Sequence, residues 1–171
     1  NCVVDDGWIC SDGINCTEIP CDTDDPGGTD SDGDGEPDSC DDSPNNHNDD
    51  LQFLTDLVDN SSLSTSPLDL GTQNWANGRL TSLSLAGSGL DGAIPTTVGN
   101  ATELKTLILQ ETNITGTLPT ELGNLSKLEN LSLGVNQLTG TIPAELGNCE
   151  NLKILNLAVN QLSGTIPAEL G

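Results

Sequence analysis

The sequence predicts a solenoid of short parallel strands with turn or 3-10 returns, preceded by a helical cap and by an irregular N-terminal segment. Three observations predict this arrangement. Residues 80–171 repeat every 24 positions, residues 49–59 carry an amphipathic helical pattern, and the composition changes near residue 60. We therefore divide the chain into a cysteine-rich segment (1–21), an acidic segment (22–48), a cap (49–79) and the repeats (80–171).

The repeats are defined by columns of apolar residues that recur every 24 positions. The first column consists of Leu80, Leu104, Leu128 and Leu152, and further leucines follow three and five residues later in each repeat. A Leu-x-Leu alternation places both leucines on one face of a strand, and a period of about 20–29 residues with L-x-x-L-x-L is typical of a solenoid. Each repeat also carries a glycine, which permits a turn, and a proline, which cannot donate to a strand ladder.

This pattern, L-x-x-L-x-L-x-x-N-x-L-x-G-x-I-P-x-x-L-G, resembles the plant-type class of the leucine-rich repeat family over residues 80–171. The resemblance implies a ladder of asparagines that hydrogen-bond to the backbone. That column reads Ser88, Thr112, Asn136 and Asn160, so we expect the first two repeats to be less regular. Cys149 occupies a column that Ala101 and Leu125 share, and we expect a buried thiol there rather than a disulfide.

Residues 49–79 are predicted to cover the first repeat, because an exposed solenoid end would present apolar core and an unpaired strand edge. The expected helix begins at Asp49 and Asp50, which suit a helix start. Its apolar face consists of Phe53, Leu54, Leu57 and Val58. Trp75 precedes the turn signal Asn77-Gly78, and we expect it to pack on the first leucines rather than to form a ligand platform.

Charge is distributed unevenly and excludes several classes of partner. The formal net charge is -23, and the first 60 residues hold 18 of the 27 acidic residues and none of the four basic ones. Binding to nucleic acid requires Lys and Arg, so we expect none. No run approaches the roughly 20 apolar residues that span a bilayer, so we expect no membrane insertion.

Residues 30–41 have the ligand spacing of a calcium-binding loop. The expected ligands are Asp30, Asp32, Asp34, the carbonyl of Glu36, Asp38 and Asp41, with a glycine at the sixth position. Calcium takes about six to eight oxygens, and crowded carboxylates repel one another without a cation. The alternative is a solvated acidic linker.

The acidic segment, about residues 22–48, resembles a thrombospondin type 3 repeat, whose D-x-C-D motif stands here at residues 38–41. The resemblance implies a chain wrapped around calcium ions with almost no apolar core. Asp22 and Asp24 look like a degenerate preceding copy that would complete a second ion site.

Five cysteines precede the cap: Cys2, Cys10, Cys16, Cys21 and Cys40. They contain no Cys-x-x-Cys pair and the chain has a single histidine, His47, so disulfides are favoured over zinc ligation. Disulfides place the protein outside a reducing cytosol, either extracellular or on the cell surface. Cys21 and Cys40 bracket the acidic loop and are the preferred pair, with further bonds among the first three cysteines. Residues 2–16 also resemble cysteine-rich repeats of bacterial surface proteins.

The sequence contains six N-x-S/T sequons, at Asn15, Asn60, Asn100, Asn113, Asn124 and Asn130. Asn100 and Asn124 share a column, so glycans there would stand in a row. The alternative is a source that attaches no such glycans.

The function that these features favour is recognition or adhesion outside the cell, with a protein or glycan ligand on the solvent face of the strands. The expected binding residues are Thr106, Ile108, Gln110, Asn130, Ser132, Ile154 and Asn156. The alternative is a structural subunit of an extracellular fibre in which copies of the chain assemble head to tail. We do not expect an enzyme, because the repeat holds no acidic pair within catalytic distance on a buried wall.

Removal of calcium is expected to expose the acidic segment to proteases. Ion binding there supplies folding free energy, so a chelator should raise cleavage within residues 20–48 and leave the solenoid folded. Limited proteolysis with mass mapping of the fragments measures this. Equal cleavage with and without the chelator would rule out a structural ion.

Overall fold

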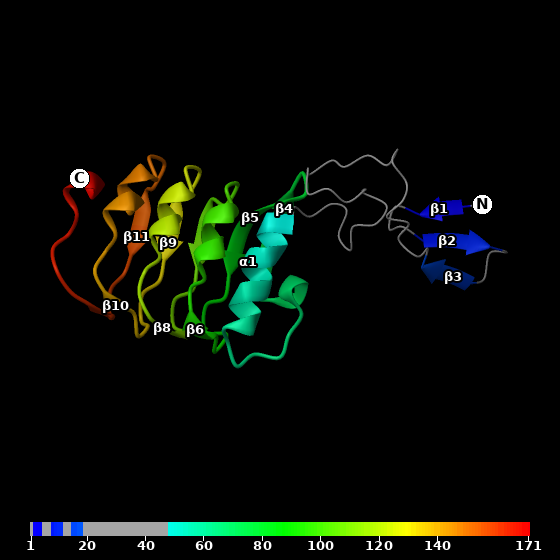
Figure 1. Ribbon diagram of the computed structural model, residues 1–171, viewed down its shortest axis with the longest axis horizontal. Helices are drawn as coiled ribbons and strands as arrows, with labels where there is room; N and C mark the ends of the chain where they lie inside the picture. The colour runs from blue at the N-terminus through cyan, green and yellow to red at the C-terminus, as the bar shows by residue number, and fades with distance from the viewer. Residues whose placement is uncertain (1, 5–7, 12–14, 19–47) are drawn as a thin grey trace.

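The computed structural model describes residues 2–4, 8–11, 15–18 and 48–171 (Figure 1). The first three ranges are the strands β1 (Cys2–Val4), β2 (Trp8–Ser11) and β3 (Asn15–Glu18), which form an antiparallel sheet in the order β1-β2-β3. The prediction of irregular structure is therefore wrong for these residues. It rested on the scarcity of large apolar side chains, whereas Val3, Val4, Trp8, Ile9 and Thr17 are residue types that favour strands.

Residues 19–47 lie outside the described part of the chain. The predicted calcium ligands, both members of the Cys21–Cys40 pair and His47 all fall in that range. The calcium site and this disulfide therefore stay predictions.

The solenoid contains four parallel strands, one in each repeat, as the leucine columns predict. They are β5 (Arg79–Ser84), β7 (Thr106–Ile108), β9 (Asn130–Ser132) and β11 (Ile154–Asn156). Leu83, Leu107, Leu131 and Leu155 lie side by side in the register of these strands. The 24-residue period therefore places equivalent leucines at the same depth of one core.

Each repeat returns through a 3-10 helix that begins immediately after its proline. These helices are η2 (Thr96–Asn100), η3 (Thr120–Asn124), η4 (Ala144–Asn148) and η5 (Ala168–Leu170). Their N-caps are Pro95, Pro119, Pro143 and Pro167. Proline lies outside every strand, as expected from its missing backbone donor.

A second row of short parallel strands stacks opposite the first row. The leucine pattern does not predict this second row. β6 (Asp91–Ala93) pairs with β8 (Asn113–Thr115), and β10 (Thr139–Gly140) pairs with β12 (Gln161–Leu162). These strands have two or three residues each, and too few of their side chains are apolar to produce the alternation that identifies a strand. The glycine of each repeat lies in or beside this row with a positive φ; at Gly92 a Cβ atom would overlap the carbonyl of Asn60.

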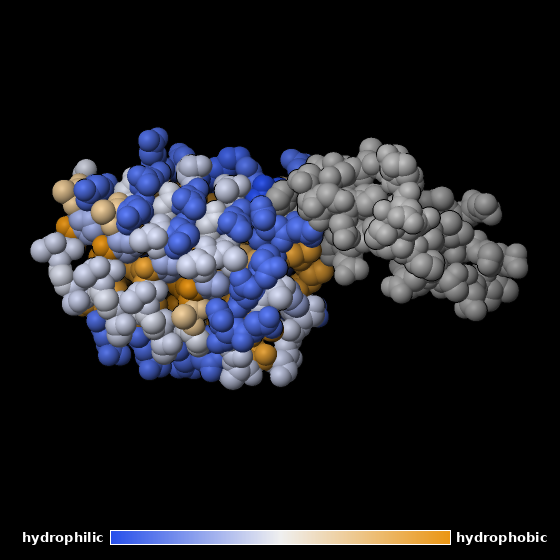
Figure 2. Space-filling view, viewed as in Figure 1, coloured by the Kyte–Doolittle hydropathy of each residue, from blue (hydrophilic) through white to orange (hydrophobic). Residues whose placement is uncertain are grey.

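The core is a continuous column of leucines between the two rows of strands. Leu80, Leu104 and Leu128 are fully buried, and so are the residues three, five and ten positions after each of them. Figure 2 shows the outside of the coil as mainly hydrophilic, with hydrophobic residues visible between the turns. Burial of each leucine contributes about 1.5–3 kcal/mol, and each repeat achieves it only against its neighbours.

The asparagine column forms the hydrogen bonds that the resemblance implies. The side-chain amide of Asn136 donates to the carbonyls of Leu109 (2.7 Å) and Leu133 (3.0 Å), while its oxygen accepts from the backbone N–H of Ile114 (3.3 Å). Asn160 repeats this pattern one turn later. The Thr112 hydroxyl has a single hydrogen to donate, and it lies 2.8 Å from both the carbonyl of Leu109 and Asn136 Oδ1. The Ser88 hydroxyl accepts one bond, from the backbone N–H of Leu90. The ladder is therefore less complete in the first two repeats, as predicted.

The cap begins with helix α1 (Asn48–Asp59), which packs beside the first repeat (Figure 1). Phe53, Leu54 and Leu57 are buried in the common core, as the helical pattern predicts. A short 3-10 helix, η1 (Pro67–Asp69), follows. The cap thereby extends the leucine core past the first repeat.

Strand β4 (Thr72–Ala76) completes the cap by pairing antiparallel with β5. The two strands are joined by Asn77 (φ 51°) and Gly78 (φ 72°), both left-handed as a type I′ hairpin requires. β4 therefore satisfies the backbone edge of the first parallel strand. Trp75 on β4 is half-buried and packs against the core, so the prediction that it covers the first leucines is confirmed.

A buried ion pair joins α1 to the first strand of the solenoid. The Asp50 carboxylate is fully buried; it accepts from Arg79 Nε (2.7 Å) and Nη2 (3.2 Å) and from the backbone N–H of Leu80 (2.8 Å). Arg79 also donates to the carbonyl of Asn100, and its bond to Asp50 raises the pKa of the guanidinium. One carboxylate thus links the cap, the first strand and, through Arg79, the first return.

The substitution Asp50→Asn is expected to lower the free energy of unfolding by about 3 kcal/mol, because it leaves Arg79 without its buried counter-charge. Urea unfolding followed by tryptophan fluorescence measures the loss. The control is Asp69→Asn at an exposed position of η1, which should change stability by less than about 0.5 kcal/mol. Equal effects of the two substitutions would show that the ion pair does not hold the cap.

Candidate interaction face

The candidate site is the solvent side of the main sheet, which we call the concave face. We define it by Ser82, Ser84, Thr106, Ile108, Gln110, Asn130, Ser132, Ile154, Asn156 and Ala158. Strand alternation places these residues opposite the buried leucines. Thr106, Asn130 and Ile154 form one register row, and Ile108, Ser132 and Asn156 form the next. The structure thus brings all seven predicted binding residues onto one surface of three adjacent strands.

A hydrogen-bonded network fixes the polar side chains at the centre of this face. The hydroxyl of Ser132 donates to Gln110 Oε1 (3.0 Å) and accepts from Asn156 Nδ2 (3.4 Å). Ser132 is only 7% exposed, although strand alternation predicts an open position on the solvent side. Its longer neighbours, Gln110 and Asn156, account for this difference because they lie on the two adjacent repeats and bond to it from both sides.

Asn130 is the half-buried residue of the middle strand. Its Oδ1 atom is buried and accepts no hydrogen bond, and it is the single side-chain atom of this kind among the described residues. A buried acceptor without a donor costs about 1–3 kcal/mol. The face therefore contains one unsatisfied acceptor, and this atom lies below the surface that a partner would contact. The same burial makes Asn130 a poorer sequon than Asn100, Asn113 and Asn124, which are exposed.

The concave face carries no charged residue, although the chain as a whole is strongly acidic. Charges lie instead at the strand entrances, where Lys127 pairs with Glu103 and Lys153 pairs with Glu129, each one repeat apart. The hydrogen bonds from these lysines lower the pKa values of both glutamates. Such exposed pairs contribute at most about 1 kcal/mol each to stability. Because both pairs lie outside the concave face, the face itself stays neutral.

A strained column runs along the rim where the strands end. Glu111, Val135 and Val159 have φ values of 54°, 58° and 56°, and Gly87 fills the equivalent position of the first repeat. A left-handed conformation costs an L-residue about 1–2 kcal/mol, and β-branched residues adopt it least readily. Val135 and Val159 are also exposed, at 47% and 71%, so neither packing nor backbone preference explains them. Sequence reasoning missed this column because the φ value is not visible in the leucine pattern.

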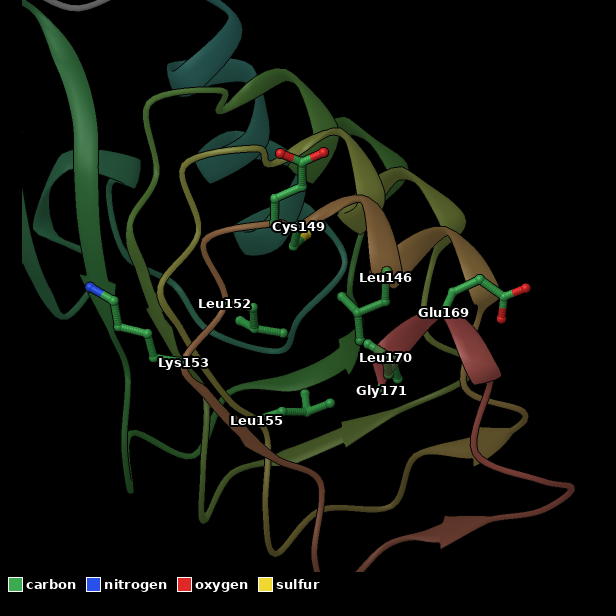
Figure 3. A pocket seen from close by; sticks show the side chains of 10 residues that line it. Leu146, Cys149, Leu152, Lys153, Leu155, Glu169, Leu170 and Gly171 are labelled. Carbon is green, nitrogen blue, oxygen red and sulfur yellow. The ribbon is translucent and has the colours of Figure 1, made fainter.

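A cavity of about 350 Å³ lies at the last repeat (Figure 3). Leu146, Leu152, Leu155 and Leu170 line it, with Lys153 and Glu169 at its margin (Figure 3). Corresponding leucines of earlier repeats contact the next turn of the coil, so the lining is the leucine core itself and not a separate ligand pocket. Cys149 also borders the cavity; it is a buried free thiol, as predicted, and desolvation raises its pKa.

Two comparisons with known proteins agree with this architecture. Residues 103–125, 127–149 and 151–171 each match the family model described as Leucine Rich Repeat. Three leucine-rich repeats are therefore present. No curated protein matches the chain in sequence. The described part of the chain contains no helix with the length and apolar character that a membrane crossing requires, and no cluster of His, Cys, Asp and Glu suited to a metal ion.

Solved structures share the fold. The crystal structure of PEPR1-AtPEP1 is similar with a TM-score of 0.66 and 28% identity, over 72% of this chain and 19% of that chain. The LRR ectodomain of the receptor kinase SOBIR1 from Arabidopsis thaliana has a TM-score of 0.59 and 24% identity, over 71% of this chain and 72% of that one. A plant ice-binding protein has a TM-score of 0.59 and 24% identity, over 74% and 45%. The chain thus spans about a fifth of the PEPR1-AtPEP1 chain and most of the SOBIR1 ectodomain.

The substitution Val135→Gly is expected to raise the free energy of unfolding by about 1 kcal/mol, because glycine adopts a positive φ without strain. Chemical denaturation of the purified chain measures the gain. The reciprocal change Gly87→Val should lower stability by a similar amount, since a Cβ atom at Gly87 meets nothing within 4 Å and only the backbone conformation is tested. A loss of stability in Val135→Gly would show that the valine side chain, and not its φ value, determines the effect.

Proposed function

We propose that this chain is a protein-interaction module of an extracellular or cell-surface protein, and that a partner binds on the concave face. The observation that carries the proposal is the ordered, uncharged network of Gln110, Ser132 and Asn156 at the centre of the face. Its hydrogen bonds fix these side chains before any partner arrives, which lowers the entropic cost of binding. The shared fold with the PEPR1-AtPEP1 structure supports an interaction role.

The chemistry of the face favours a neutral, extended partner. Gln110 and Asn156 present amide groups, and Ile108 and Ile154 add apolar surface in two neighbouring register rows. An extended polypeptide offers this combination, because its backbone supplies donors and acceptors while its side chains meet the isoleucines. The face lacks the aromatic and arginine anchors of tight interfaces, so we expect a broad contact of micromolar affinity.

We further propose that calcium bound to the acidic segment stiffens the chain ahead of the cap. This proposal rests on the spacing of the acidic residues in 30–41 and on the oxygen chemistry that calcium prefers. The disulfides predicted for the cysteine-rich segment would favour an extracellular location. The described residues add no observation in favour of a head-to-tail fibre. The function that we put forward is therefore the binding of a partner on the concave face.

The substitution Ile108→Arg is expected to weaken binding to the concave face at least tenfold, because it places a charge and a longer side chain in a neutral surface. The probe is a displayed library of random linear peptides, selected against the immobilised wild-type chain. Calorimetry then compares the selected peptides on the wild-type chain and on the variant. A tenfold change corresponds to about 1.4 kcal/mol.

The matched control is Gln137→Arg, which adds the same charge at an exposed position of the same solenoid away from the concave face. Binding to this variant should stay within about twofold of wild type. Peptides that bind Ile108→Arg as tightly as the wild type, or that respond equally to both substitutions, would contradict the proposed site.

A further inference from the structure

Three of the early cysteines lie in one transverse row of the small N-terminal sheet. In the register of β1 and β2, Cys2 is opposite Cys10, and in the register of β2 and β3, Cys10 is opposite Cys16. β2 is the central strand, so Cys10 has a cysteine at the same level on each side. The sequence alone does not show this, because it leaves the bonds among the first three cysteines open.

The spacing of antiparallel strands decides which of these cysteines are close enough to bond. Residues directly opposite one another have Cα atoms about 4.5–5.5 Å apart, which lies within the range of about 4.4–6.8 Å that disulfides span. Residues on the two outer strands are separated by two strand spacings, or about 9–10 Å. That separation exceeds the limit of about 7 Å for a disulfide.

We propose that Cys10 forms a disulfide with one of its two register neighbours, Cys2 or Cys16, and that these two neighbours are not bonded to each other. The bond forms when two thiols lose their hydrogens and join as S–S, while the two electrons pass to a protein disulfide that is reduced to a dithiol. The proposal is independent of the function put forward for the concave face. It restricts the bonds among the first three cysteines to those that include Cys10.

The proposed bond has a structural reason. A three-stranded sheet of such short strands is marginal on its own, and small segments without a large core are commonly stabilised by disulfides. A bond across the central strand connects it to one outer strand and fixes their register. The remaining cysteine of the row can then form a disulfide with Cys21 or Cys40, or it stays a free thiol.

The experiment is a disulfide map of the full chain secreted into an oxidising compartment. Free thiols are alkylated at acidic pH, and the unreduced protein is cut on the N-terminal side of aspartate, which releases Cys2, Cys10 and Cys16 on the separate fragments 1–4, 6–11 and 12–21. A second cut after Glu18 separates Cys16 from Cys21. We expect mass spectrometry to find fragment 6–11 linked to fragment 1–4 or to the part of 12–21 that contains Cys16.

Three results would overturn the proposal: alkylated Cys10, a bond from Cys10 to Cys21 or Cys40, or a bond between Cys2 and Cys16. Two variants serve as matched controls. Cys149→Ser and Cys40→Ser should both retain the linkage of fragment 6–11, because neither residue belongs to the row. Loss of the linkage of fragment 6–11 in Cys40→Ser would also contradict a bond from Cys10 to Cys2 or Cys16.

Discussion

No repeat of this solenoid can bury its own leucines. Leu83, Leu107, Leu131 and Leu155 lie beside one another in the register of the parallel strands, so each becomes part of a core only when the neighbouring repeat supplies the opposite wall. This dependence explains why the polar parts of the structure also act between repeats. Asn136 bonds to the carbonyls of two consecutive turns, and the glutamates at the strand entrances pair with lysines one repeat away.

The same dependence makes the start of the coil the place where special interactions are required. The first repeat has a weak ladder, since Ser88 accepts a single bond, and no repeat precedes it to supply the neighbouring wall of the core. The cap compensates with buried residues of α1, with the Asp50–Arg79 pair and with the antiparallel strand β4. Repeated hydrogen bonds therefore stabilise the later repeats, whereas one buried carboxylate and one hairpin stabilise the first repeat.

Much of this fold could be predicted from the sequence because it depends on side-chain type at fixed intervals. The leucine columns identified the parallel strands, the prolines located the 3-10 returns, and the order Ser, Thr, Asn, Asn in one column indicated where the ladder is incomplete. What could not be predicted depends on backbone conformation or on short polar strands. Neither the second row of strands nor the positive φ of Val135 has a signature in the apolar pattern.

The candidate face was predicted residue by residue, but its internal contacts were not. Strand alternation placed Ser132 on the solvent side correctly, yet only the structure shows that two neighbouring amides cover it. The acidic loop and the predicted Cys21–Cys40 pair lie outside the described residues, so the calcium ligands rest on sequence spacing alone. The register row of Cys2, Cys10 and Cys16 is the part of that region for which the backbone adds information.

The hairpin of β4 and β5 restricts where a further repeat can be inserted into the solenoid. β4 runs opposite to all four parallel strands, so a duplicated 24-residue unit cannot be inserted between β4 and β5 without disrupting their turn at Asn77 and Gly78. Insertion between later repeats preserves every column and adds one strand, which lengthens the concave face by about 4.8 Å. The number of repeats can therefore change while the cap remains unchanged.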